Sequence, residues 1–564
     1  MPKIRLPLVG SMSTRNVDAV TVLASKDQIF SGVMFDVIKN PVTGKGSVFA
    51  FKRPGLKSGT TIATSKTACG MCDPYGFNDI TSTCTAWTVG GSTNEEIYVG
   101  TTSCGVTSGT GTSHRFDITK AIIAGEETYL LSNVRGCYFI NETGLSGTTT
   151  FTGDFSSGTN TILNASSTTG LVVGQYINAT SYTAASGTRI TNISGSTITM
   201  QDNAIGTAAG ITVTRERMAK FIAANFPSSV IGPMWEMDGY VFAAEQGSQK
   251  IYHSDLNTVQ TWTSTNFVSA NATPGQLLGI SRLGQVIVAH TPDSMQYFYN
   301  AGNAVGSVLS RVQNKTIHVG GLVRGGSFWA GASLVRPFTV LDDNLFVVSN
   351  SIYQVATDGS MKRISTDIVD RLIANTAASS INIQAMYFLG KPYVFLSDGS
   401  TVITYSLMYD VSLGLWSHTG FTAVPIFSKN MGYCQNTTLF SGRLDTWPWT
   451  SDGGTPTYQD NGSTLTTTIQ TGRLDFGSSQ RTHITRIDLI GDKQASGTVT
   501  LTSSDNDFAS FATLGTFDLT AMNPRIYRCG HFVGGRSLKL THTTNAAFRA
   551  EALDIYYEDA EEMA

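Results

Sequence analysis

Residues 237–262 read MDGYVFAAEQGSQKIYHSDLNTVQTW. The pair Asp238-Gly239 is a strong hairpin signal, because both residue types tolerate the positive φ angles of a tight turn. The apolar run 240–244 after it predicts a strand, and the segment 251–256 with its aromatic residue predicts another. The stretch therefore predicts a turn, a strand, a polar break and a further strand.

The same pattern recurs along the chain. Turn pairs stand at 238–239, 283–284, 343–344 and 389–390, and an apolar strand and then a second strand with an aromatic residue follow each pair. Steps of about 45 residues, with one longer step, are typical of propeller blades of four strands. A closed ring of blades also protects strand edges that would otherwise invite aggregation. We therefore expect a β-propeller.

The composition supports an all-β protein. The chain has 564 residues, which predicts more than one domain, and 57 of them are glycine. Only 14% are charged, against roughly 25% in typical globular chains, so we expect neighbouring subunits to cover much of the surface. The formal net charge is -3 and no basic tract occurs. These features do not support sequence-specific or tight binding of nucleic acid through phosphate contacts.

Changes in composition divide the chain into five segments. A nearly uncharged region rich in Thr, Ser and Gly separates two groups of propeller strands, and a last group of alternating strands predicts a sandwich. We expect an extended N-terminal segment that lies across a neighbouring domain or subunit (1–58), the first part of the propeller (59–140), an inserted β-module (141–214), the rest of the propeller (215–454) and a C-terminal β-sandwich (455–564). The segment RERMAKFIAANFP, residues 215–227, predicts a short helix that ends before Pro227.

The cysteines and the hydropathy bear on the compartment. The opening residues lack the apolar segment of a signal peptide, and no run of about 18 apolar residues occurs, so we expect no membrane span. The seven cysteines have irregular spacings, which favours a reducing cytoplasm. They are Cys69, Cys72, Cys84, Cys104, Cys137, Cys434 and Cys529. A zinc site at the Cys69–Cys72 pair would need a second pair, for which Cys84 and Cys104 are loose candidates. Structural thiols are the favoured interpretation, with no metal or cofactor.

A glycan-cleaving propeller of the sialidase type is the alternative hypothesis. The segments 254–262 and 397–416 are loosely similar to the Asp-box turns of such propellers, which are structural. A sialidase needs clustered arginines, and Arg282, Arg311, Arg324, Arg336, Arg363 and Arg371 are scattered in the sequence. It also needs acidic groups at defined separation. The adjacent pairs Glu95-Glu96 and Asp342-Asp343 have the character of turn residues.

Other candidate groups have structural interpretations. His253, His290 and His318 lie near predicted strands without metal-ligand spacing. The glycine-rich segment 320–328 lacks the Gly-Lys-Ser/Thr of a phosphate loop. Trp447 and Trp449 flank a proline and could form a sugar platform, although packing within a blade is favoured. We assign no catalytic, cofactor-binding or metal-binding residue and expect no enzyme.

Several segments resemble one family of phage proteins. IKNPVTGKGSVFAFKRPGL (38–56) is similar to the N-terminal region of tail nozzle proteins of short-tailed, podovirus-type bacteriophages, also called tail hub or packaged-DNA-stabilisation proteins. Residues 237–262 and 277–302 resemble their propeller. Residues 474–492 and 525–558 resemble their C-terminal domain. GLVVGQYINAT (170–180) and GTRITNISGSTITM (187–200) resemble a small β-module inserted in many phage structural proteins.

The resemblance implies a function and partners. It implies a structural virion protein that forms a homo-hexameric tube below the portal and the tail adaptor protein, extends the DNA channel, retains the packaged genome and passes it at ejection. Tail fibre or spike proteins and a distal plug or needle are the other implied partners. Genomic double-stranded DNA would pass through the lumen without sequence-specific binding. The implied location is the virion tail, assembled in the cytoplasm of the bacterial host.

Overall fold

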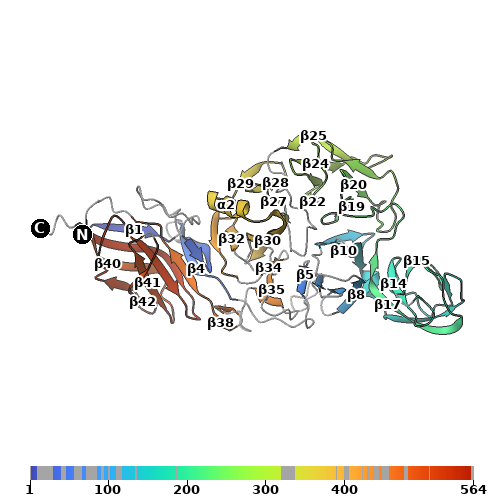
Figure 1. Cartoon of the computed structure of the whole chain (residues 1–564), viewed down its shortest axis with the longest axis horizontal. Helices are drawn as coiled ribbons and strands as arrows, with labels where there is room; N and C mark the ends of the chain where they lie inside the picture. Colours follow the sequence, from blue (N-terminus) through green and yellow to red (C-terminus); the bar gives the residue numbers. More distant parts are fainter. Residues whose placement is uncertain are drawn as a thin grey trace.

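The computed structural model describes three bodies in a row, with a β-sandwich at one end, a β-propeller in the centre and a small β-barrel at the other end (Figure 1). No helix in the described part of the chain is long and apolar enough to cross a membrane. The described residues are 2–8, 29–39, 46–55, 67–71, 86–90, 94–99, 102–108, 117–133, 136–184, 187–318, 337–388, 390–398, 405–421, 424–427, 432–435, 444–447, 457–460, 462–474, 481–506 and 508–559.

The propeller comprises seven sheets within these described ranges, one for each blade. The first three blades are β5 (Thr67–Met71), β6 (Ala86–Gly90), β7 (Asn94–Val99) and β8 (Thr102–Ser108); β9 (Asp117–Ile123), β10 (Glu126–Asn133), β11 (Gly136–Asn141) and the end of β17 (Ala208–Lys220); and β18 (Trp235–Met237), β19 (Tyr240–Ala244), β20 (Lys250–His253) and β21 (Phe267–Ser269).

The fourth and fifth blades are β22 (Gly279–Leu283), β23 (Val286–His290), β24 (Met295–Asn300) and β25 (Leu309–Ile317); and β26 (Phe338–Leu341), β27 (Asn344–Val348), β28 (Ile352–Ala356) and β29 (Met361–Arg363). The last two are β30 (Ile381–Phe388), β31 (Lys391–Asp398), β32 (Ser406–Asp410) and β33 (Leu415–His418); and β34 (Val424–Phe427), β35 (Gly432–Gln435) and β36 (Leu444–Trp447). Helix α2 (Asp367–Asn375) and the 3-10 helix η2 (Ala378–Ser380) connect blades 5 and 6.

The ring of blades is closed. The first strands β5, β9, β18, β22, β26, β30 and β34 contact one another in this order, and β34 also contacts β5. Side chains join neighbouring blades through main-chain carbonyls: Trp235 Nε1 of blade 3 donates to Ile280 O of blade 4 at 2.9 Å, and Trp416 Nε1 of blade 6 donates to Ile364 O at 2.7 Å. These bonds satisfy indole groups that burial would otherwise penalise.

The predicted hairpins are confirmed, with a shift of one residue at two of them. In the blade 3 hairpin Asp238 and Gly239 have φ of 56° and 81°. The blade 4 and blade 5 turns begin at Gly284 (φ 59°) and Asp342 (φ 49°), because Leu283 pairs with Val286 and Leu341 pairs with Asn344. These turns connect the first and second strands of their blades.

The inserted module is a closed barrel of six strands among the described residues. Its strands are β12 (Thr150–Phe155), β13 (Thr161–Leu163), β16 (Thr197–Met200), β15 (Thr188–Ser194), β14 (Gln175–Asn178) and β17, and β12 also pairs with β17 to close it. The short helix α1 (Glu142–Leu145) precedes it. The barrel has its own apolar core, which includes Phe151, Ile162 and Ile190.

The prediction of a helix over residues 215–227 is wrong. Residues up to Lys220 belong to the 13-residue strand β17, which leaves the barrel and pairs with β11 as the outer strand of blade 2. Two buried side chains decide this: Met218 packs in the core that includes Ile97 and Tyr129, and Ala219 packs on the other side with Phe139 and Phe221. Burial on both faces overrides the helix propensity of the segment.

The sandwich consists of two sheets that contain strands from both ends of the chain. One sheet contains β1 (Lys3–Pro7), β3 (Val33–Lys39), β4 (Gly46–Lys52), β40 (Arg481–Gly491), β43 (Arg525–Tyr527), β44 (His531–Val533) and β46 (Arg549–Asp559). The other contains β2 (Ile29–Ser31), β39 (Thr467–Gln470), β45 (Ser537–His542), β41 (Thr498–Ser504) and β42 (Ala512–Asp518). The small hairpin β37 (Gln459–Asp460) and β38 (Ser463–Thr464) precedes β39. The N-terminal segment therefore lies across the C-terminal domain of the same chain.

Candidate functional site

The joint between the propeller and the sandwich is held by main-chain pairing on both sides of one short strand. Strand β2 pairs in parallel with β33 of blade 6, through Ser31 and His418, and antiparallel with β39 of the sandwich, from Ile29 to Ser31. A single sheet thus runs from β30 of the propeller to β42 of the sandwich. Main-chain hydrogen bonding therefore links the two domains without an interruption.

Arg53 connects three parts of the chain at this joint. Its side chain is 1% exposed, and its guanidinium donates to both carboxylate oxygens of Asp460, at 3.0 Å and 2.7 Å. Its Nε donates to Thr419 O, and the group lies 4.5 Å from the ring centre of Phe421. Two-point pairing of this kind fixes direction as well as distance. Arg53 therefore holds the N-terminal segment, the end of blade 6 and the entry to the sandwich in one geometry.

Lys52 is a second buried cation beside Arg53. Its Nζ donates to Thr544 O at 2.8 Å and lies 3.4 Å from His542 Nδ1. Burial, and then the charge of Arg53, lower the pKa of Lys52 to about 8. Burial, and then the charge of Lys52, lower the pKa of His542 to about 4. Both charged forms are thus disfavoured by the same enclosed environment.

An apolar cluster completes the joint. Met34 and Phe51 of the N-terminal hairpin pack against blade 6 side chains that include Met386, Phe395 and Met408. An ion pair between Asp36 and Lys391 lies at the edge of the same contact. Apolar burial, main-chain pairing and charge pairing thus all act between the same two domains.

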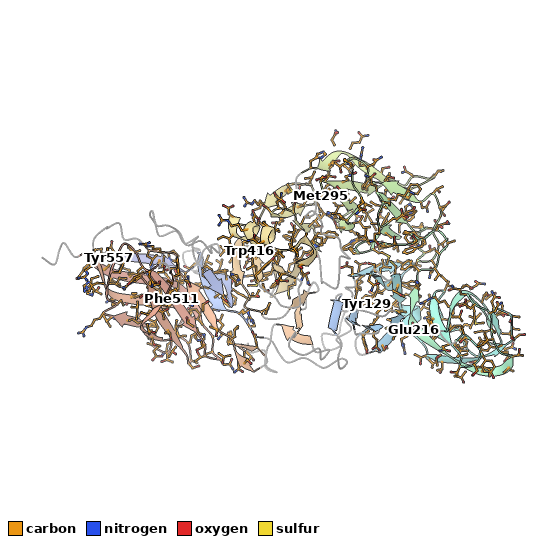
Figure 2. All side chains as sticks on the ribbon, in the orientation of Figure 1. Tyr129, Glu216, Met295, Trp416, Phe511 and Tyr557 are labelled. Carbon is orange, nitrogen blue, oxygen red and sulfur yellow. The ribbon has the colours of Figure 1, made fainter. Side chains whose placement is uncertain are left out.

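The barrel has a joint of its own with the propeller, at Glu216 (Figure 2). Its carboxylate accepts the Val106 N–H of blade 1 at 3.2 Å, and a β-carbon at Gly105 would lie 2.8 Å from it. Burial raises the pKa of Glu216 to about 7, although the Val106 N–H bond and Arg189 act in the opposite direction. Gln260, between β20 and β21 of blade 3, also links the propeller to the barrel. Its Nε2 donates to Val173 O and Lys220 O, at 3.0 Å and 2.7 Å.

In both Asp-box-like segments an aspartate stands at the turn between the third and fourth strands of its blade. Asp255 accepts hydrogen bonds from Thr263 and Asn266, and Trp262 after it is buried. In blade 6 Asp410 accepts the N–H groups of Ser412 and Leu413, and Trp416 is buried. Each aspartate organises its own loop, which is a structural role.

The groups named for a sialidase-type site are held in separate contacts. Arg282 pairs with Glu236 at 3.1 Å, and Arg363 pairs with Asp367 at 2.7 Å on the outside of blade 5. Arg311 lies on the outer strand β25 and Arg371 on helix α2. Asp342 accepts the Tyr387 hydroxyl at 2.5 Å across blades 5 and 6, whereas Ser103 donates to Glu96 within blade 1. Arg324 and Arg336 lie outside the described residues.

The histidines and cysteines are also placed separately. His253 Nε2 accepts Val308 N–H at 3.1 Å, His290 Nε2 lies 2.8 Å from Ser281 Oγ, and His318 is exposed. Among the described residues, no group of three metal-binding side chains occurs. Cys104, Cys137 and Cys529 are buried free thiols, and burial raises the pKa of each. Cys69, Glu95, Cys434 and Trp447 lie in strands β5, β7, β35 and β36, and Cys72, Cys84, Trp449 and residues 320–328 lie outside the described residues.

Sequence reasoning missed Arg53, Asp460 and Glu216. The signal for Arg53 was a pair of cations at the end of an alternating strand and directly before Pro54-Gly55. Cations at such a position normally face solvent. Asp460 is a single carboxylate in a polar stretch, and nothing local distinguishes it.

Comparisons with known proteins find solved structures that are similar to this chain at low sequence identity. No family model and no curated protein matches the chain. Solved structures that are similar include the N-terminal domain of Nup159 (9% identity, 74% of this chain and 98% of that chain, TM-score 0.32) and the dihydro-heme d1 dehydrogenase NirN (9%, 82% and 76%, 0.32). An exo-beta-1,3-galactanase from Phanerochaete chrysosporium is also similar (9%, 72% and 95%, 0.24). Likenesses at this level carry no argument about function.

Proposed function

We propose that this chain is the subunit of a tail nozzle of short-tailed bacteriophages. It would be a structural virion protein that assembles as a homo-hexamer below the portal and adaptor. The tube extends the DNA channel, retains the packaged genome and passes it at ejection. Tail fibres or spikes and a distal plug or needle attach to it, and assembly takes place in the host cytoplasm before the protein becomes part of the virion tail.

The observation that carries the proposal is the joint at Arg53. Residues 38–56, which resemble the N-terminal region of nozzle proteins, include the end of strand β3, the whole of strand β4 and the cations Lys52 and Arg53. A wall around pressurised DNA needs blocks whose domains do not move relative to one another. A continuous sheet with a buried two-point ion pair supplies such a block, and blocks of one shape form a ring by heterologous contacts that close.

The charge of the chain is compatible with a conduit. The formal net charge is -3, so a lumen formed by this chain need not attract phosphate. The proposal assigns no catalytic step and no cofactor.

Negative-stain imaging of the purified chain, alone and mixed with virion tails, tests the proposal. We expect six-fold rings with an open centre wide enough for duplex DNA, and binding at the tail. Stable monomers that never join a tail would count against it. Cleavage of glycans by such monomers would favour the sialidase-type alternative, and heat-denatured protein is the control for that assay.

A further inference from the structure

The outer face of one sandwich sheet has an ordered set of charges. Cross-strand pairing aligns Arg5, Asp554, Asp488 and Arg525 in one row on β1, β46, β40 and β43. The next row contains Lys3, Tyr556, Arg486 and Tyr527, with Arg486 3.9 Å from the ring centre of Tyr556. We call this surface the sandwich face.

In these two rows the cations are more exposed than the anions. The side chain of Arg5 is 53% exposed, whereas that of its partner Asp554 is 4% exposed. Asp488 is 14% exposed and pairs with Arg486. Tyr527 and Val533 are exposed beside the cations Arg481 and Arg525. Arginine and tyrosine around apolar groups are the composition of a protein interface.

The opposite charge lies on the propeller, on the side that carries the first-to-second and third-to-fourth strand turns of blades 3 to 5. We call this surface the turn face. Leu256, Tyr299 and Val305 are exposed there, in blades 3 and 4. Four carboxylates in turns of blades 3 and 5 are also exposed on this side, namely Asp238, Asp342, Asp343 and Asp358.

Most cations near the turn face are paired with groups of the same chain or lie at the rim of the ring. Arg282 pairs with Glu236. Lys315 donates to Thr357 O at 3.1 Å, which ties blade 4 to blade 5. The exposed Arg311 and Lys362 lie on the outer strands β25 and β29, at the rim of the ring. The turn face therefore has exposed apolar side chains with carboxylates beside them.

We propose that the sandwich face of one copy of this chain docks on the turn face of a second copy. The two surfaces are complementary in charge and each has exposed apolar groups, so the favoured occupant of each is the other. Two different surfaces meet in this contact, so one copy keeps a free turn face and the other keeps a free sandwich face. Copies add head to tail until the assembly closes, and closure as a ring rests on the proposed function.

The strands at the free edge of this sheet favour docking on the face of the sheet over strand addition at its edge. Strands β43 and β44 have three residues each and are separated by Arg528 at φ 58° and Gly530 at φ 82°. Short, interrupted edge strands are poor templates for strand addition. A second copy therefore meets the side chains of this sheet.

Charge reversal on each surface tests the proposal. One variant has Arg481→Glu with Arg525→Glu, and the other has Asp343→Lys with Asp358→Lys. Sedimentation velocity at low and high salt measures association of the full chain. We expect each variant alone to associate about tenfold more weakly or worse, because both of its surfaces then have the same sign. An equimolar mixture of the two variants restores association, because the reversed surfaces complement each other.

Matched controls reverse the same charges elsewhere. Lys493→Glu with Lys539→Glu changes other parts of the sandwich, and Asp293→Lys with Asp202→Lys changes the opposite side of the propeller and the barrel. We expect both controls to associate as the parent chain does. Circular dichroism of every variant shows whether it is folded.

Several outcomes would overturn the inference: a parent chain that stays monomeric, a reversed variant that associates as tightly as the parent, or a mixture that does not recover. Rings that neither reversal affects would leave the nozzle proposal standing without this contact. Open filaments sensitive to both reversals would support the contact and count against the nozzle.

Discussion

Arg53 and Asp460 lie 407 positions apart in the chain, and the guanidinium of one donates two hydrogen bonds to the carboxylate of the other. Because Arg53 is buried, the pair works as a fixed joint between domains. A buried pair has a large desolvation cost, so the two partners depend on each other far more than exposed partners do. This dependence can be measured.

Replacing Arg53 by methionine should destabilise the joint by about 3–5 kcal/mol, because Asp460 and the Thr419 carbonyl lose their donor in a water-poor site. The shift in the urea unfolding midpoint measures this loss. Arg363→Met is the matched control, since Arg363 is itself 46% exposed in its pairs with Asp367 and Asp370, and a change of about 0–1 kcal/mol is expected. Equal shifts for the two variants would show that Arg53 has no special structural role.

Glu216→Gln should stabilise the chain at pH 8 more than at pH 4.5. Burial raises the pKa of Glu216 to about 7, so its favourable contribution is fully present below pH 4.5 and is lost as pH rises through 7. The glutamine side chain does not ionise, so the variant avoids this loss of unfolding free energy, which is on the order of 2 kcal/mol. The difference in melting temperature between the two proteins across pH 4.5–8 tests this. Glu142→Gln, an exposed carboxylate on helix α1, is the control, and an equal pH trend there would contradict the assignment.

The effect of Lys52→Met on the free energy of unfolding, relative to the parent chain, should be more favourable at pH 7.5 than at pH 10.5. The pKa of Lys52 falls to about 8 in the folded chain from 10.5, so the unfolded chain binds more protons between these values. The parent chain therefore gains stability as pH rises from 8 to 10.5, whereas the methionine variant does not gain it from this site. Unfolding midpoints at both pH values measure the difference. A constant difference between the two proteins would mean that Lys52 is charged in the folded state throughout.

The barrel should be removable. Thr150 and Thr214 lie opposite each other where β12 and β17 meet, so the two chain ends are about 5 Å apart. Replacing residues 151–213 by Asn-Gly should leave a folded propeller, because the buried residues of the barrel core are separate from those of the blade cores, although the partly buried Val172 that packs against blades 2 and 3 is lost. Retained near-ultraviolet circular dichroism and a cooperative melt are expected. The same replacement of residues 382–417 within blade 6 is the control, and it should abolish folding.

Much of the propeller could be predicted from sequence, because its signals are local. The pair Asp238-Gly239 marks its own turn through two positive φ angles, and the apolar strand after it is buried. The near lack of charge over residues 141–214 predicts a separate module, and the barrel strands lie between Thr150 and Lys220. The helix prediction over residues 215–227 is wrong because Met218 and Ala219 are buried in two different cores. No local sequence pattern encodes this burial.

The joint could not be predicted for the same reason. Strand β2 has only three residues, and its partners Thr468 and His418 lie far along the chain. Arg53 is recognisable as a joint residue only once Thr419 and Asp460 are beside it. Interactions between distant segments leave no periodicity to detect.

The place of β2 also sets an order of events during synthesis. Its residues leave the ribosome early, yet β33 ends at His418 and β39 at Gln470. At about 5–20 residues per second, Ile29 to Ser31 wait roughly 20 to 90 seconds for both neighbours. For that time Phe30, which is fully buried in the finished molecule, has no partner strand from either domain. The propeller and the sandwich therefore become one body only near the end of translation, and this interval is when the nascent chain most needs a chaperone.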